Sequence, residues 1–151
     1  MRFATLGSLL TGRPEPSFIS PAASAREAVR QLQRSDVRAV VVTHAAPPVR
    51  IVSDLHIVDS VIARQCDPDT LTAFELSVPT ESFERTTTLD IAWNSVKDKS
   101  LPWVAVRDGN RVIALVSRTQ MLEWVVRSQE DEVDCAINAV KRLAFANRRP
   151  D

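Results

Sequence analysis

The strongest constraint on the fold of this chain is an internal repeat. An offset of 64 residues, the separation of Val40 and Val104, superimposes the two halves without a gap. The aligned positions are Ile19 with Phe83, Ala28 with Ala92, Leu32 with Val96, residues 40–42 with 104–106, and residues 51–53 with 115–117. One shift aligns all of these, so the halves are expected to share their element order and loop lengths.

Each half is predicted to fold as strand, helix, strand, strand and helix. Ser24 and Glu27 form a capping box that starts a helix, and β-branched runs favour strands. The elements expected in the first half are strand 17–20, a helix after Ser24, strands 38–43 and 49–53, and helix 54–64. Those expected in the second half are strand 82–84, helix 89–97, strands 103–107 and 112–116, and helix 118–126. The predicted fold class is mixed α/β, of the α+β kind.

The length of 151 residues suits one compact domain with two lobes. A unit of about 60 residues has a thin core of its own, so the apolar faces of the two sheets are expected to pack together. The predicted divisions are residues 1–67 for the first repeat, 68–128 for the second, and 129–151 for a C-terminal helix and tail.

The segment after Ser128 leaves the repeat but keeps an apolar stripe at helical spacing, which predicts an additional helix. Acidic residues begin it and basic residues end it, as suits a helix dipole. The acidic residues are Glu130, Asp131, Glu132 and Asp134, and the basic ones are Lys141, Arg142, Arg148 and Arg149. Two alternatives remain open: the helix packs back on its own domain, or its stripe pairs with a second subunit.

Composition disfavours several classes of protein. Lys and Arg together number 19, as do Asp and Glu, so no overall positive field attracts nucleic acid or an anionic membrane. No run approaches the ~20 apolar residues of a membrane span. The N-terminus lacks a convincing secretory signal, so we expect a cytoplasmic protein with Cys66 and Cys135 reduced. Residues 7–14 lack the Lys-Ser/Thr pair of a phosphate loop, which argues against a nucleoside triphosphatase.

Catalysis and metal binding are not expected. Ser53, Asp54 and His56 are the residue types of a hydrolytic triad, but a triad needs convergent geometry and an oxyanion site. His44, His56 and Cys66 do not form a metal-ligand pattern, and His44 is interpreted as a turn residue. We therefore expect no catalytic residue, no metal site and no cofactor.

Taken together, these segments resemble the cystathionine-β-synthase (CBS) domain family in its tandem form, the Bateman module. The resemblance covers the chain up to about Arg127, and the same order of segments occurs twice. Its carriers are residues 9–16, 20–24, 27–28 and 40–42 in the first half, and 86–89, 101–106 and 111–117 in the second. The resemblance implies a regulatory module that binds AMP, ADP, ATP or S-adenosylmethionine in clefts between the repeats and forms a homodimer.

The family's cleft motif is a glycine, two apolar residues, Ser or Thr, two further residues and Asp. The hydroxyl and helix N–H groups suit a phosphate, and the Asp suits the ribose hydroxyls. This sequence keeps only the hydroxyls. The first copy has Arg50, Ser53 and His56 at the glycine, hydroxyl and Asp positions, and the second copy has Ala114, Ser117 and Gln120. With the adjacent Arg118, the candidate ligand-binding residues are Ser117, Arg118, Gln120, Ala114, Ser53 and His56.

The second copy is the stronger candidate. Ser117 and Gln120 also form a capping box, so they could serve only to start a helix. Arg118 favours the interpretation as a ligand site, because a cation in the first turn of a helix is unfavourable for the helix dipole unless an anion lies next to it. In the first copy, Asp54 would repel a phosphate.

Loss of the motif's Asp in both copies favours a rival interpretation, a ligand-free assembly module with decayed clefts. In that module the C-terminal helix and the tryptophans would hold a protein partner. Trp93, Trp103 and Trp124 all occupy positions that the repeat predicts to be apolar, so they could also lie in the core or a dimer interface. For Trp103, stacking on an adenine is a further alternative.

Overall fold

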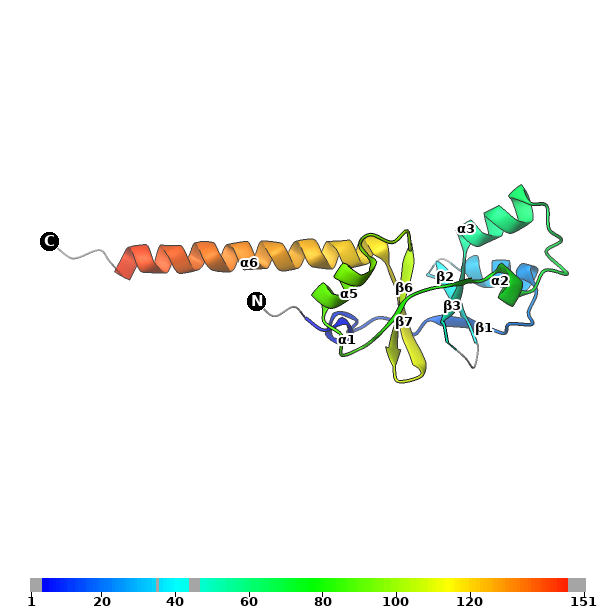
Figure 1. The fold of residues 1–151 in the computed structure, drawn as a ribbon, viewed down its shortest axis with the longest axis horizontal. Helices are drawn as coiled ribbons and strands as arrows, with labels where there is room; N and C mark the ends of the chain where they lie inside the picture. The colour runs from blue at the N-terminus through cyan, green and yellow to red at the C-terminus, as the bar shows by residue number, and fades with distance from the viewer. Residues whose placement is uncertain (1–3, 35, 44–46, 147–151) are drawn as a thin grey trace.

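The computed structural model describes residues 4–34, 36–43 and 47–146, which form two sheets (Figure 1). One sheet has the order β1-β2-β3-β4 and the other β5-β6-β7. The strands are β1 (Ser17–Ile19), β2 (Ala39–Val42), β3 (Arg50–Ser53), β4 (Val78–Pro79), β5 (Ser82–Glu84), β6 (Trp103–Asp108) and β7 (Arg111–Ser117). In both sheets the first strand pairs parallel with the second, which forms an antiparallel hairpin with the third. The repeated strand order is therefore confirmed.

Helices complete a mixed α/β fold, as the sequence predicts. They are α1 (Leu6–Leu9), α2 (Ala25–Leu32), α3 (Asp54–Ile57), α4 (Ala73–Leu76), α5 (Leu89–Val96) and α6 (Arg118–Ala146), and a π-helical segment, η1 (Val58–Ala63), follows α3 directly. Ser24 begins α2 as predicted, because its Oγ accepts a hydrogen bond from the Glu27 N–H at 3.2 Å. Sequence analysis missed α1, α4 and β4, which have four residues or fewer and are too short for a periodic pattern.

Successive side chains of β2 alternate between two hydrophobic clusters, and one of these clusters includes residues of the other sheet. Val40 and Val42 belong to the core beneath α2, whereas Val41 belongs to a cluster with Ala105 and Val112 of the other sheet. Successive side chains of a strand point to opposite faces, so one strand contributes to both cores. The expected packing of the two sheets against each other is confirmed.

Each half begins with a segment that packs on the other half. Leu6 of α1 is fully buried in the core of the second half, and its N–H donates to the Thr87 carbonyl at 2.9 Å. Next to it, Gly7 donates to the Arg85 carbonyl at 2.8 Å, and a Cβ at Gly7 would lie only 3.1 Å from that oxygen. A glycine therefore allows α1 to approach the second half closely.

The exchange is reciprocal. Ala73 and Leu76 of α4 are buried in the core of the first half, and Thr72 forms an isolated β-bridge with Ser24. Each hydrophobic core therefore includes residues from both sides of the predicted division at residue 67.

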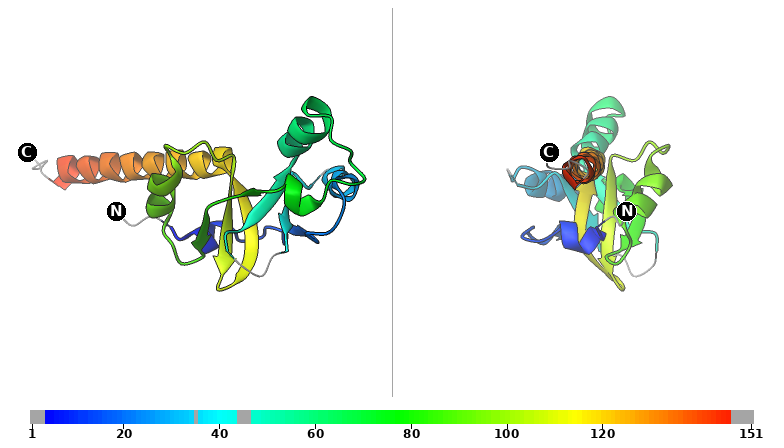
Figure 2. Two further views of the ribbon diagram at one scale, coloured as in Figure 1. Left: turned by 45° about the vertical axis from the view of Figure 1, so that its right-hand side comes forward. Right: turned by 90° about the vertical axis from the view of Figure 1, so that its left-hand side faces the viewer.

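A single helix of 29 residues, α6, contains both the last helix of the repeat and the additional C-terminal helix. The predicted helix after Ser128 is present, but without a break from the helix before it. Met121, Trp124 and Val125 are buried, whereas every residue from Gln129 to Ala146 is exposed. This part extends away from the sheets and does not pack back on its own domain (Figures 1 and 2). Arg148 and Arg149 lie outside the described residues, as do His44 and the first part of the 45–48 loop.

Among the helices that the structure describes, none combines the length and the apolar content needed to cross a bilayer.

Candidate ligand cleft

A cleft of about 400 Å³ lies between the two halves of the molecule. The linker 13–17 and residues 36–39 line it from the first half. From the second half come Trp103 of β6 and three residues of β7, namely Ala114, Leu115 and Ser117. Two of the predicted site residues, Ala114 and Ser117, are therefore placed together in a cleft between the repeats.

Ser117 is the residue at which β7 ends and α6 begins. Its Oγ accepts a hydrogen bond from the Gln120 N–H at 3.1 Å, so the predicted helix cap is present. The hydroxyl proton is still available to donate to a ligand in the cleft. The Gln120 side chain lies close by, where its Oε1 accepts from Arg13 at 3.0 Å and its Nε2 donates to Glu123 at 3.3 Å.

Arg118 does not line this cleft. Its guanidinium donates to the carbonyls of the last turn of α5 and just beyond it: Val96 at 3.0 Å, Lys97 at 2.5 Å and Lys99 at 2.8 Å. It also lies 5.3 Å from the centre of the Trp93 ring. The carbonyls at a helix C-terminus lack intrahelical partners and carry partial negative charge.

The partner of the Arg118 cation in the structure is thus the partly negative C-terminal end of α5. Sequence analysis missed this partner because backbone carbonyls are the same in every residue type. We had expected Arg118 beside a ligand phosphate in this cleft, and the structure places it outside the lining.

Two other cations border the cleft, Arg13 and Arg38, and both side chains are exposed. The Arg13 guanidinium also lies 5.5 Å from the centre of the Trp124 ring. Glu15 and Asp36 are the acidic residues of the lining, and Glu15 pairs with Arg111. Sequence analysis did not single out these arginines, because only the fold brings the linker and the turn before β2 beside β7.

In the first half, the position that corresponds to Ala114 carries a large side chain, that of Arg50. Arg50, the counterpart of Ala114 by the 64-residue offset, donates from Nε to Ser77 Oγ at 2.8 Å and from Nη2 to the Ser77 carbonyl at 2.9 Å. Its guanidinium lies 4.7 Å from the centre of the Phe74 ring. Ala114 lines the cleft of the second half with a small side chain. Arg50 instead links β3 to the end of α4 through its hydrogen bonds to Ser77.

Ser53 and His56 support the start of α3 and do not line the cleft that contains Ser117. Ser53 is fully buried, and its Oγ has no close hydrogen-bond partner among the described residues. His56 Nδ1 accepts from the Ser53 N–H at 3.0 Å, and burial lowers the pKa of this imidazole. The structure therefore separates these two candidate residues from Ser117 and Gln120.

The three residue types of a triad also serve this helix start. Asp54 accepts a hydrogen bond from the Leu55 N–H at 2.9 Å, while His56 is engaged with the Ser53 backbone. Within the described ranges, no three His, Cys, Asp or Glu side chains form a group that could hold a metal ion.

Comparisons with known proteins identify the fold. No family model matches the sequence, and no curated protein matches it. Among solved structures, a hexameric CBS-CP12 protein from bloom-forming cyanobacteria is 19% identical, with a TM-score of 0.70 over 95% of this chain and 89% of that chain. A CBS-domain protein from Pyrobaculum aerophilum, complexed with AMP, is 21% identical, with a TM-score of 0.65 over 82% of this chain and 99% of that chain.

A CBS-domain protein from Agrobacterium tumefaciens is similar as well, at 19% identity and a TM-score of 0.64 over 79% of this chain and 96% of that chain. These structures share the overall fold described above. The chain therefore has the fold of a tandem pair of CBS domains, extended by a C-terminal helix.

Proposed function

We propose that this protein is a regulatory CBS-domain pair that binds an adenosine-containing ligand in the cleft lined by Trp103 and Ser117. The observation that carries the proposal is this cleft, which both halves form and which has a serine hydroxyl at a helix start. Its volume of about 400 Å³ falls within the range of small-molecule sites. The similar protein from Pyrobaculum aerophilum, solved with AMP, supports the choice of ligand class.

In this proposal each part of the ligand meets a different part of the lining. The Ser117 hydroxyl donates to a phosphate, whose charge Arg13 and Arg38 balance. The Trp103 ring and Leu115 offer an apolar surface to the adenine. Gln120 lies beside the lining, where it accepts a hydrogen bond from Arg13, and its amide takes the ribose hydroxyls in place of the family's Asp.

Signalling then follows from the position of the cleft between the halves. A ligand that binds one arrangement of the two halves more tightly shifts the population toward that arrangement, and a partner reads the change. We propose that the protein has no enzymatic activity, needs no cofactor, acts in the cytoplasm as a homodimer, and does not bind nucleic acid.

Calorimetric titration of ligand-stripped protein with AMP, ADP, ATP and S-adenosylmethionine tests the cleft. We expect saturable micromolar binding of one of them. Replacing Arg38 with Glu should weaken it by about 10- to 100-fold through loss of a charge-assisted contact. The control Arg30→Glu changes an exposed arginine of α2 that pairs with Glu27, outside the cleft lining, and should leave the affinity unchanged. Equal effects of the two variants would contradict this site.

The second candidate function is a ligand-free assembly module. Two observations favour it: Arg50 occupies the equivalent position in the first half, and α6 exposes apolar residues far from the sheets. Absence of heat with all four ligands, from a folded sample, would reject the sensor and support this alternative.

A further inference from the structure

A heptad pattern runs along the exposed side of α6. Apolar or small residues alternate at spacings of four and three, as in a coiled-coil seam. The positions are Leu122, Val126, Gln129, Val133, Ala136, Val140 and Leu143, with one polar residue, Gln129, among them. Val133 is 56% exposed, Val140 65% and Leu143 65%, so the seam is largely uncovered in the single chain.

The projecting part of α6 buries none of its residues against the part of the chain that the structure describes. Residues 129–146 are all exposed, and they span about 27 Å at a rise of about 1.5 Å per residue. Isolated helices shorter than about 12–15 residues are marginal in water, and in proteins most helical stability comes from packing of an apolar face rather than from propensity. A partner on the seam would supply that packing.

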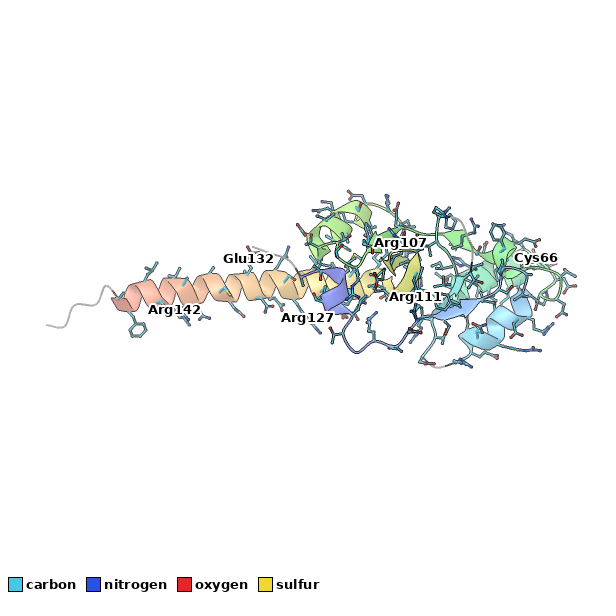
Figure 3. All side chains as sticks on the ribbon, turned by 90° about the horizontal axis from the view of Figure 1, so that it is seen from below. Cys66, Arg107, Arg111, Arg127, Glu132 and Arg142 are labelled. Carbon is cyan, nitrogen blue, oxygen red and sulfur yellow. The ribbon has the colours of Figure 1, made fainter. Side chains whose placement is uncertain are left out.

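Charge along this segment is divided between its two ends. The half nearer the sheets carries Glu130, Asp131, Glu132 and Asp134, and the far half carries Lys141 and Arg142. Glu132 and Arg142 mark the two halves in Figure 3. A parallel pair of these helices would place acidic beside acidic residues, which repel. An antiparallel pair places the acidic half of each helix beside the basic half of the other.

The shape of the molecule also suits the antiparallel arrangement. The sheets lie at the N-terminal end of α6, and the projecting part extends from them in one direction (Figure 1). Two such helices that overlap along residues 129–146 in opposite directions hold the two pairs of sheets at opposite ends, where they do not collide.

We propose that α6 of one protomer pairs antiparallel with α6 of a second copy of this chain, through a seam of Val133, Ala136, Val140 and Leu143. Val133 and Val140 supply branched apolar side chains, and the small Ala136 lets the helices approach closely. The inference goes beyond the proposed ligand cleft and depends on α6 alone.

Sedimentation of the full chain tests the seam. We expect a dimer for the wild-type protein and a monomer for the double variant Val133→Glu/Val140→Glu. Asn138→Glu introduces the same charge on the opposite side of the helix and should remain dimeric. Both variants should keep the melting temperature of the sheets, because residues 129–146 bury nothing there. A monomeric wild-type protein, or a double variant of unchanged mass, would overturn the proposal.

Charge exchange tests the orientation. The variant Glu130→Lys/Asp131→Lys/Glu132→Lys/Asp134→Lys makes both halves basic, so an antiparallel dimer should dissociate about tenfold more readily. Adding Lys141→Glu/Arg142→Glu should restore the affinity, and raised salt should weaken the wild-type dimer. For a parallel pair, the first variant should change the dissociation of the dimer little, and raised salt should strengthen the wild-type dimer. Those two results would overturn the antiparallel assignment.

Ligand titration of the wild-type protein and of Val133→Glu/Val140→Glu separates the two proposals. Normal ligand binding by a wild-type protein that is monomeric, or by a double variant that stays dimeric, rejects only the α6 seam. Absence of ligand binding by a wild-type protein whose dimer depends on Val133 and Val140 rejects only the cleft.

Discussion

Arg118 illustrates how a residue acquires its role from a neighbour that is distant in sequence. A cation in the first turn of a helix opposes the helix dipole. In the structure, the Arg118 guanidinium donates hydrogen bonds to the carbonyls of Val96, Lys97 and Lys99 at the end of α5. One side chain therefore compensates the ends of two helices at once, and it does so outside the ligand cleft.

Replacing Arg118 with Ala should lower the free energy of unfolding by about 1–2 kcal/mol, since several charge-assisted hydrogen bonds are lost. Urea denaturation measures this change. Arg127→Ala, an exposed arginine on the same helix, should change stability by less than about 0.5 kcal/mol. Loss of ligand affinity in Arg118→Ala at unchanged stability would contradict the structural role.

His56 makes stability depend on pH. Burial lowers its pKa in the folded protein, and the accepting Nδ1 requires the neutral ring. As the pH falls below the unfolded value of about 6.5, the unfolded chain binds the proton first. The contribution of this residue is therefore present above that pH and is lost as the pH falls through the interval down to the folded pKa.

The variant His56→Gln keeps an acceptor for the Ser53 N–H and removes the titration. Its melting temperature should fall less than that of the wild-type protein between about pH 7 and about pH 5.5. Thermal melts followed by circular dichroism measure both decreases, and equal decreases would show that other groups are responsible.

At the scale of elements, the sequence predicted what local pattern and repetition encode. Periodicity and the 64-residue offset predicted α2, α5 and both hairpins, and the capping box predicted the start of α6 at Ser117. The missed elements, α1 and α4, are stabilised by contacts with the opposite half, and the local sequence pattern of a segment does not predict such long-range contacts. The cleft was predicted only in part for the same reason: Ser117 and Ala114 follow from the motif, whereas Arg13 and Arg38 arrive through tertiary packing.

Substitution of Leu6 tests whether α1 packs on the core of the second half in solution. Leu6→Ala should lower the free energy of unfolding by about 2–4 kcal/mol, because it removes a fully buried side chain from the core of the second half. Leu55→Ala makes the same chemical change at a residue that is 62% exposed, and its effect should stay below about 1 kcal/mol. Similar losses at the two sites, in urea denaturation, would mean that α1 is not docked in solution.

At the scale of the whole molecule, the exchanged segments and the shared cluster of Val41, Ala105 and Val112 join the halves into one structure. The division into repeats is therefore not a division into independent domains. The projecting part of α6 is the exception, since residues 129–146 are all exposed and belong to neither core.

Unfolding should accordingly be a single transition. The three tryptophans, Trp93, Trp103 and Trp124, all belong to the second half, so their fluorescence reports on that half alone. Far-ultraviolet circular dichroism reports on both halves. We expect the two signals to give the same midpoint in urea for a variant chain that ends at Ser128, in which neither dimer dissociation nor unfolding of residues 129–146 contributes. Separate midpoints would show that the halves unfold independently.

The exchange of segments also determines the order in which the two cores can form during synthesis on the ribosome. Leu6 is synthesised well before the core that receives it, which includes Met121 and Trp124 of α6. The core of the first half likewise stays incomplete until Leu76 has been synthesised. The segment that contains Leu6 therefore leaves the exit tunnel before its native neighbours and stays without them until the start of α6 has been made.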